Sequence, residues 1–153
     1  MEWLLDILNN PFLLTALSSW LIAQVIKAVI NAVVNKKFSL ERLFCDGGMP
    51  SGHSATVTSL AVITGLIYGL DSFNFAVVAV LAIVVCHDAM GVRQETGKQA
   101  VVINEIVKIF TMLTEEKLPE VKLKEFVGHT PAQVIAGIVL GILNAIVMYY
   151  VIL

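Results

Sequence analysis

The residues best suited to chemistry lie in three short polar segments, each next to a long apolar run. They are GGMPSGHSA at 47–55, HDAMGVR at 87–93 and GHTPAQVIAG at 128–137, and together they hold all three histidines of the chain. Polar and ionisable side chains at the edge of a membrane are costly to keep there, so they mark functional sites by default. The three segments are therefore the candidates for a functional site.

Two of these segments lead into predicted helices. Pro50, Ser51 and Gly52 precede one apolar run, and the first N–H groups of a helix that begins there lack acceptors within the helix. A helix start built from small residues is a ready anion site. Thr130 and Pro131 have the types favoured at the N-cap and at the first position of a helix. Both starts are suited to a negatively charged group.

Cations and histidines complete a set suited to phosphate. Arg93 has planar donors that match phosphate oxygens, and Lys27 is a cation inside the first apolar run. Of two histidines near a phosphate, one can attack phosphorus and the other can protonate the leaving oxygen. Simpler explanations exist for each residue. A histidine at a helix start is often a cap, Lys27 could snorkel or pair with Gln24, and Asp88 could pair with Arg93.

The composition places these residues in a membrane protein. Of 153 residues, 58% are hydrophobic and 14% are charged, whereas a soluble domain has about 25% charged residues. This excludes an ordinary soluble domain and a disordered chain. The net charge of −2 gives no basic footprint for nucleic acid. Two cysteines, and three histidines without a ligand pair on one helix face, predict no metal site and no cofactor.

Long apolar runs predict an all-α integral membrane bundle that forms one domain over 1–153. A membrane-spanning helix needs roughly 20 apolar residues. Between 98 and 116, apolar side chains recur on one side at helical spacing, which predicts an amphipathic helix in the interface or on the bundle. The predicted membrane spans are about 11–34, 54–70, 73–89 and 131–153.

Pairs of small residues four positions apart, Gly65–Gly69 and Gly137–Gly141, indicate close packing of helices. The contact can lie within one subunit or between two, which leaves a homodimer open.

The distribution of positive charge predicts the orientation. With four spans, segments 35–53 and 87–130 lie on one side of the membrane and both termini lie on the other. Nine of the ten Lys and Arg residues fall in these two segments, and the tenth, Lys27, lies inside the first span. The positive-inside rule then places both segments, with the polar clusters, in the cytoplasm, and the termini outside the cell membrane.

The polar segments also resemble the motifs of a known family. PSGH at 50–53 and GHTPAQVIAG at 128–137 resemble two signature motifs of the type 2 phosphatidic acid phosphatases, a superfamily that includes the vanadium haloperoxidases. The combination of GGMPSGHSA, DAMGVR and GHTP is more specifically similar to its divergent branch, small bacterial and plant membrane proteins of unsettled activity. The resemblance covers nearly the whole chain, from the first span to the last.

The resemblance implies a phosphatase mechanism that needs no metal. His129 matches the histidine that attacks phosphorus and forms a phosphohistidine, and His53 matches the general acid for the leaving group. The implied reaction is hydrolysis of a lipid phosphate or a polyprenyl (di)phosphate. By the same resemblance, the substrate-binding residues are Ser51, Gly52, Arg93 and Lys27.

Three departures from the parent family bear on turnover. Gln133 occupies the position of an aspartate that orients the nucleophile and stabilises its cation, and loss of the carboxylate in an analogous triad costs about 10⁴ in rate. Asp88 and Glu95 are candidate replacements for that carboxylate. Arg93 is separated from His129 by the amphipathic segment, and no Arg-Pro pair accompanies Lys27.

Two alternatives to an active phosphatase follow from the same residues. The first is a lipid- or phosphate-binding membrane protein with weak or no turnover, which Gln133 favours. The second is a small transport accessory, which only Lys27, as a charge inside a span, favours.

Overall fold

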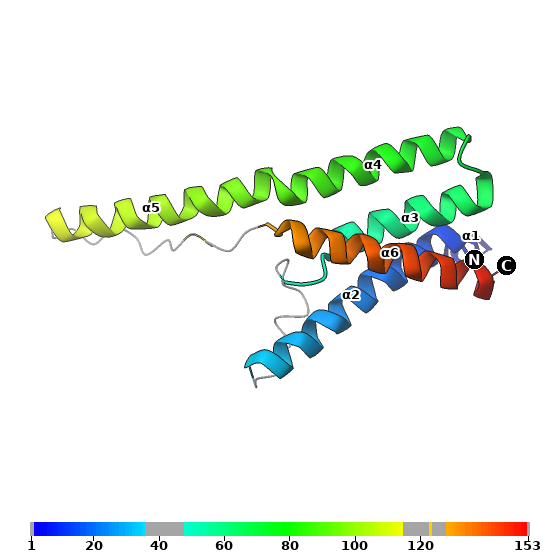
Figure 1. Ribbon diagram of the computed structural model, residues 1–153, viewed down its shortest axis with the longest axis horizontal. Helices are drawn as coiled ribbons and strands as arrows, with labels where there is room; N and C mark the ends of the chain where they lie inside the picture. The colour runs from blue at the N-terminus through cyan, green and yellow to red at the C-terminus, as the bar shows by residue number, and fades with distance from the viewer. Residues whose placement is uncertain (1, 36–47, 115–122, 124–127, 153) are drawn as a thin grey trace.

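The computed structural model describes residues 2–35, 48–114, 123 and 128–152, with every side chain in these ranges except those of 2, 35, 92–94, 114 and 152. All regular structure in the described ranges is helical (Figure 1). The helices are, in chain order, α1 (Glu2–Leu8), α2 (Pro11–Asn35), α3 (Gly52–Tyr68), α4 (Phe73–Met90), α5 (Val92–Thr114) and α6 (Pro131–Ile152).

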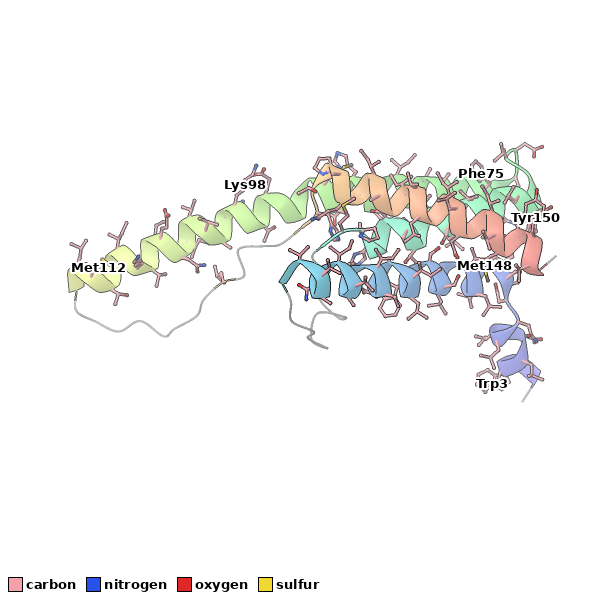
Figure 2. All side chains as sticks on the ribbon, turned by 60° about the horizontal axis from the view of Figure 1, so that its bottom comes forward. Trp3, Phe75, Lys98, Met112, Met148 and Tyr150 are labelled. Carbon is pink, nitrogen blue, oxygen red and sulfur yellow. The ribbon has the colours of Figure 1, made fainter. Side chains whose placement is uncertain are left out.

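The helix α3 is the central element, because it packs against α2, α4 and α6. α5 continues outward beyond the end of α4 and, of the described helices, packs only against α4 (Figure 1). The short α1 packs against α2. Figure 2 shows Trp3 on α1 at the same end of the molecule as Tyr150 on α6. Aromatic side chains gather where helices meet the membrane–water boundary, so this end is suited to that position.

Three stretches of the described chain are long and apolar enough to cross a membrane: Pro11–Val34, Phe73–Leu113 and Pro131–Val151. Each of the four predicted spans overlaps a helix along most of its length, although α3 ends at Tyr68 rather than at 70 and residue 153 lies outside the described residues. The predicted all-α membrane bundle is confirmed. The helix α3 has 17 residues, and its length of about 26 Å is short of a hydrocarbon core of about 30 Å. A fourth crossing by α3 therefore stays a prediction.

The amphipathic helix begins earlier than predicted. α5 starts at Val92 rather than at 98, directly after the non-helical Gly91 that ends α4. Its first turns lack apolar periodicity, but a 2.6 Å ion pair between Lys98 and Glu95, three residues apart, supports the helix there. Residues 115 and 116 of the predicted helix lie outside the described residues.

Short polar side chains fix where the helices begin. Asn10 Oδ1 accepts the N–H groups of Phe12 at 3.0 Å and Leu13 at 3.2 Å, at the start of α2. Ser72 caps α4 by accepting the N–H of Phe75 at 3.2 Å. Such caps satisfy N–H groups that have no acceptor within the helix, and an unsatisfied group in lipid costs several kcal/mol.

Polar contacts between α2, α3 and α6 hold the bundle together internally. Asn144 Nδ2 on α6 lies 2.8 Å from Ser19 Oγ, 2.9 Å from Ser18 Oγ and 3.2 Å from Thr15 O on α2. Ser59 on α3 donates to the same Thr15 carbonyl at 3.4 Å. Hydrogen bonds of this kind contribute about 0.6–2 kcal/mol each in membranes. They fix the register of the helices that carry the polar segments.

Glycines on α6 allow it to approach α3 closely. A Cβ at Gly137 would lie 2.5 Å from Ser51 O, and one at Gly141 would lie 2.6 Å from Ala55 O. The contact indicated by these small residues therefore occurs within one chain. The homodimer stays a prediction.

Candidate functional site

Two backbone hydrogen bonds join the three polar segments at one end of the bundle. The N–H of His129 donates to Ala89 O at the end of α4, at 3.0 Å. The N–H of Ser51, just before α3, donates to Gln133 O in the first turn of α6, at 2.9 Å. The starts of α3 and α6 and the end of α4 are therefore held in one cluster.

The cluster brings two histidine rings together. The ring centroids of His53 and His129 are 6.4 Å apart, and the ring planes are inclined at 58°. His129 is 2% exposed, whereas His53 is open at the surface of the protein. Reacting atoms stand about 3–3.5 Å apart before attack, and a hydrogen bond spans about 2.8 Å, so rings at this separation can contact one phosphate group.

The start of α3 offers two backbone donors beside this pair. Ser51 caps the helix. Its Oγ accepts a hydrogen bond from the N–H of Ser54 at 3.3 Å, and its carbonyl oxygen accepts one from the N–H of Ala55 at 3.1 Å. Within the described part of the chain, the N–H groups of Gly52 and His53 have no acceptor. They form the positive end of the helix dipole, which favours an anion.

Lys27 supplies a cation at the same helix start. A Cβ built on Gly52 would lie 3.7 Å from Lys27 Nζ, and one on Gly48 would lie 3.5 Å from Lys27 Cδ. Lys27 is only 7% exposed. A buried ammonium next to a helix N-terminus concentrates positive potential at one point. The sequence did not predict where Lys27 lies relative to the polar segments. In the structure, Lys27 lies beside the PSGH segment.

Gln24 and Trp20 lie near Lys27 on the same face of α2. Among the described residues, the buried Gln24 Oε1 has no hydrogen-bond partner, which contradicts the alternative in which Lys27 pairs with Gln24. Sequence reasoning missed Trp20, whose Cδ1 would lie 3.5 Å from a Cβ on Gly52. The signal was available, because Trp20 precedes Lys27 by two helical turns and so shares its face of α2.

Ser51 has a structural role in addition to the predicted one. Its side chain is fully buried at 0% exposure, and its Oγ also lies 3.0 Å from the hydroxyl of Ser54. A serine hydroxyl has one donor and two acceptor positions, so the capping bonds leave the donor for another group. Contact between Ser51 and a phosphate oxygen stays a prediction.

Gln133 lies against the buried histidine. Its Oε1 is 3.1 Å from His129 Nδ1 and also accepts the N–H of Thr130 at 3.1 Å. The N–H of Gln133 in turn approaches Thr130 Oγ1 at 3.4 Å. This reciprocal pair is a capping box at the start of α6. Gln133, the residue predicted to orient His129, is thus in contact with it.

The remaining predicted residues, Arg93 and Asp88, lie at the start of α5 and near the end of α4. Arg93 lies in the first turn of α5, and its side chain lies outside the described residues. Asp88 is half-buried near the end of α4, next to the Ala89 carbonyl that accepts from His129. The contact to Nδ1 of His129 comes from Gln133.

Among the described residues, no three His, Cys, Asp or Glu side chains gather as a possible metal site.

We expect Lys27→Met to weaken the binding of inorganic phosphate or vanadate by about 10- to 100-fold, because a hydrogen bond between charged groups contributes about 1.5–3 kcal/mol. Isothermal titration of the purified protein in detergent measures the affinity. Lys98→Met is the matched control, since Lys98 is exposed on α5 and pairs with Glu95. Equal affinity of the Lys27 variant and the unmodified protein would remove Lys27 from the predicted anion site.

Comparison with known proteins gives two findings. Residues 8–144 match the family described as the Divergent PAP2 family. The chain is also similar to the uncharacterized membrane protein YuiD of Bacillus subtilis (strain 168), with 41% identity over 155 aligned positions that cover 95% of this chain and 98% of the relative. No solved structure gives a significant match.

Proposed function

The chain belongs to the divergent PAP2 family, and on that premise we propose that it is a membrane-embedded phosphatase that hydrolyses a lipid phosphate or a polyprenyl (di)phosphate. The observation that carries the proposal is the pair of imidazoles, 6.4 Å apart, beside the start of α3. The buried ammonium of Lys27 lies at the same helix start. This arrangement suits the binding and cleavage of an anionic headgroup.

The proposed reaction has two steps. A ring nitrogen of His129 attacks phosphorus, the bond between phosphorus and the ester oxygen breaks, and His53 donates a proton to the leaving oxygen. A water oxygen then attacks phosphorus while His53 accepts a proton from that water, the bond between phosphorus and the His129 nitrogen breaks, and inorganic phosphate leaves. The N–H groups of Gly52 and His53, with Lys27, stabilise charge on the phosphoryl oxygens. Arg93 and the Ser51 hydroxyl are proposed as further phosphate ligands.

The charge pattern supports a cytoplasmic position for this reaction. The segments that carry the site hold nine of the ten basic residues, so we propose that they face the cytoplasm and that the substrate comes from the inner leaflet. The termini then lie outside the cell membrane.

A panel of lipid phosphates tests the proposal directly. We expect the purified protein in detergent to release inorganic phosphate from at least one phosphatidic acid, lysolipid phosphate or polyprenyl (di)phosphate, with inhibition by vanadate. Rapid quenching should trap a phosphoryl group that is stable in alkali and labile in acid, as expected for phosphohistidine. Absence of both release and a trapped intermediate across the panel would contradict an enzymatic function.

One observation favours a second candidate, a phosphate-binding protein without turnover. Gln133 supplies a neutral oxygen to His129 where a carboxylate would stabilise the imidazolium. This candidate predicts saturable binding of vanadate together with no phosphate release. The panel therefore separates the two functions. Lys27, which alone favoured a transport role, is in this proposal a ligand of the anion.

A further inference from the structure

The amide oxygen of one buried side chain on α2 is left without a hydrogen bond. Gln24 is 7% exposed. Of the buried side-chain nitrogen and oxygen atoms in the described ranges, its Oε1 is the one without a partner. A buried acceptor without a donor lowers stability, and such groups are rare in native proteins. The oxygen is therefore suited to a donor that a ligand supplies.

Gln24 lies beside the start of α3, where the candidate anion site is. Trp20 precedes it by four residues and Lys27 follows it by three, so the three side chains share one face of α2. A Cβ built on Gly52 would lie 3.5 Å from Trp20 Cδ1 and 3.7 Å from Lys27 Nζ. The two neighbours of Gln24 thus converge on Gly52, and the buried amide lies between them against the first turn of α3.

Space for a small group lies over Gly52. The three atoms nearest to the built Cβ are at 3.5, 3.7 and 3.9 Å, which are ordinary contact distances, so a carbon there would overlap none of them. At Gly137 and Gly141, by contrast, a Cβ would meet backbone oxygens at 2.5 and 2.6 Å. The glycine at 52 therefore leaves room for about one carbon beside the N–H groups of Gly52 and His53.

The groups around this space suit a hydroxyl. Gln24 Oε1 needs a donor, and Trp20 Nε1, 3.9 Å from the built Cβ, is a donor. A hydroxyl donates and accepts through one atom, so it can bond both groups in a space of this size. An ammonium group there would be repelled by Lys27, and a phosphate or carboxylate oxygen would be repelled by Gln24 Oε1.

We propose that Trp20, Gln24 and Gly52 form a subsite for a hydroxyl of the substrate. The proposal deepens the proposed function and rests on it for the position of the phosphate at the N–H groups of Gly52 and His53. Because the space adjoins these groups, the hydroxyl belongs to a carbon close to the phosphate ester. The preferred substrate is then a lipid phosphate with a free hydroxyl there, such as a monoacylglycerol phosphate, rather than a phosphatidic acid or a polyprenyl phosphate.

Two lipids that differ in one oxygen test the subsite by binding alone. One is the phosphonate analogue of 1-acylglycerol 3-phosphate, in which carbon replaces the ester oxygen so that no cleavage occurs, and the other is its 2-deoxy counterpart. Trp3 and Trp20 are the two tryptophans of the chain, so Trp3→Phe makes Trp20 emission the reporter of binding in detergent micelles. We expect the hydroxylated lipid to bind about 10- to 100-fold more tightly.

Variants of Gln24 separate this role from a structural one. Gln24→Leu removes the acceptor and should make the two affinities about equal. Gln24→Glu keeps an acceptor and should keep the preference, although its charge weakens the binding of both lipids. Gln99→Leu, at an exposed glutamine on α5, is the matched control and should leave the preference unchanged. Without lipid, Gln24→Leu should unfold at the same or a higher temperature than wild type, because it removes an unsatisfied buried oxygen.

Three results would overturn the subsite. They are equal affinities of the two lipids for the wild-type protein, a preference that Gln24→Leu leaves unchanged, and a loss of the preference in Gln24→Glu, which would assign the contact to the NH₂ group.

Failure of the proposed function gives a different result. If no lipid phosphate is hydrolysed but binding shows the expected preference, the enzymatic function is overturned and the subsite is supported. If lipid phosphates with and without the hydroxyl are hydrolysed at equal rates, the enzymatic function is supported and the subsite is overturned.

Discussion

Replacement of His129 by alanine should abolish phosphate release from the lipid substrate, with a loss in kcat of about 10⁴-fold or more. The variant lacks the nitrogen that is proposed to form the covalent intermediate, so the proposed two-step reaction cannot begin. The trapped phosphoryl signal should disappear at the same time. The measurement is phosphate release under saturating substrate, with His87→Ala as the matched control, since His87 is an exposed histidine at the end of α4.

The effect of removing His53 should depend on the leaving group. A general acid contributes about 10²–10⁴-fold when the leaving group needs a proton. We therefore expect His53→Ala to lose this factor with an alkyl phosphate, but far less with p-nitrophenyl phosphate, which leaves without protonation. His129→Ala should be inactive with both substrates. Equal activity of His129→Ala and wild type, or equal losses by His53→Ala on both substrates, would contradict the assigned roles.

The second large effect is expected from Gly137→Ala at the contact between α6 and α3. The added Cβ would lie 2.5 Å from Ser51 O, 3.0 Å from Ser54 Cβ and 3.3 Å from Ala55 N. Two of these three atoms are backbone, so no side-chain rotation relieves the overlap and the helices must separate. Overpacking of this kind costs about 1–3 kcal/mol. The separation should also stretch the bond from Ser51 N–H to the Gln133 carbonyl.

We expect Gly137→Ala to lose more phosphatase activity than its lower thermal stability alone would cause. A displacement of about 1 Å between reacting groups can cost about 10²-fold in rate. Gly141→Ala is the comparator, because its Cβ would meet Ala55 O at 2.6 Å, one turn farther from the histidines. Both variants should lower the unfolding temperature in detergent to a similar extent, and Gly137→Ala should lose more activity. Ile135→Ala, on an exposed face of α6, is the control. Wild-type activity in Gly137→Ala would contradict the proposed positioning.

The sequence predicted the helices well where apolar runs are long. The runs at 11–34, 73–89 and 131–153 each coincide with a helix, because continuous apolar composition has few alternatives in lipid. The start of α5 was less predictable, since its first turns carry no apolar stripe and are helical through local pairs such as Glu95 and Lys98. The short α1 was not predicted, because seven residues give too little periodicity.

The site was predictable in outline but not in its contacts. The positions of the polar segments at one membrane edge predicted that His53 and His129 would be neighbours, and their rings are 6.4 Å apart. The distance of Lys27 from the anion site depends on how α2 packs against α3, which no local pattern encodes. The position of Trp20 beside Gly52 depends on the same packing of α2 against α3. The double contact of Gln133 Oε1 needs coordinates as well, since sequence shows a capping motif but not the ring beside it.

The backbone bonds that join Ala89 to His129 and Ser51 to Gln133 have a consequence for biogenesis. In chain order, His129 stands just before α6, so His53 on α3 is synthesised earlier, before α4 and α5. The two rings come together only after α6 has entered the bilayer and docked. A chain that stalls before that step therefore lacks the proposed reaction centre.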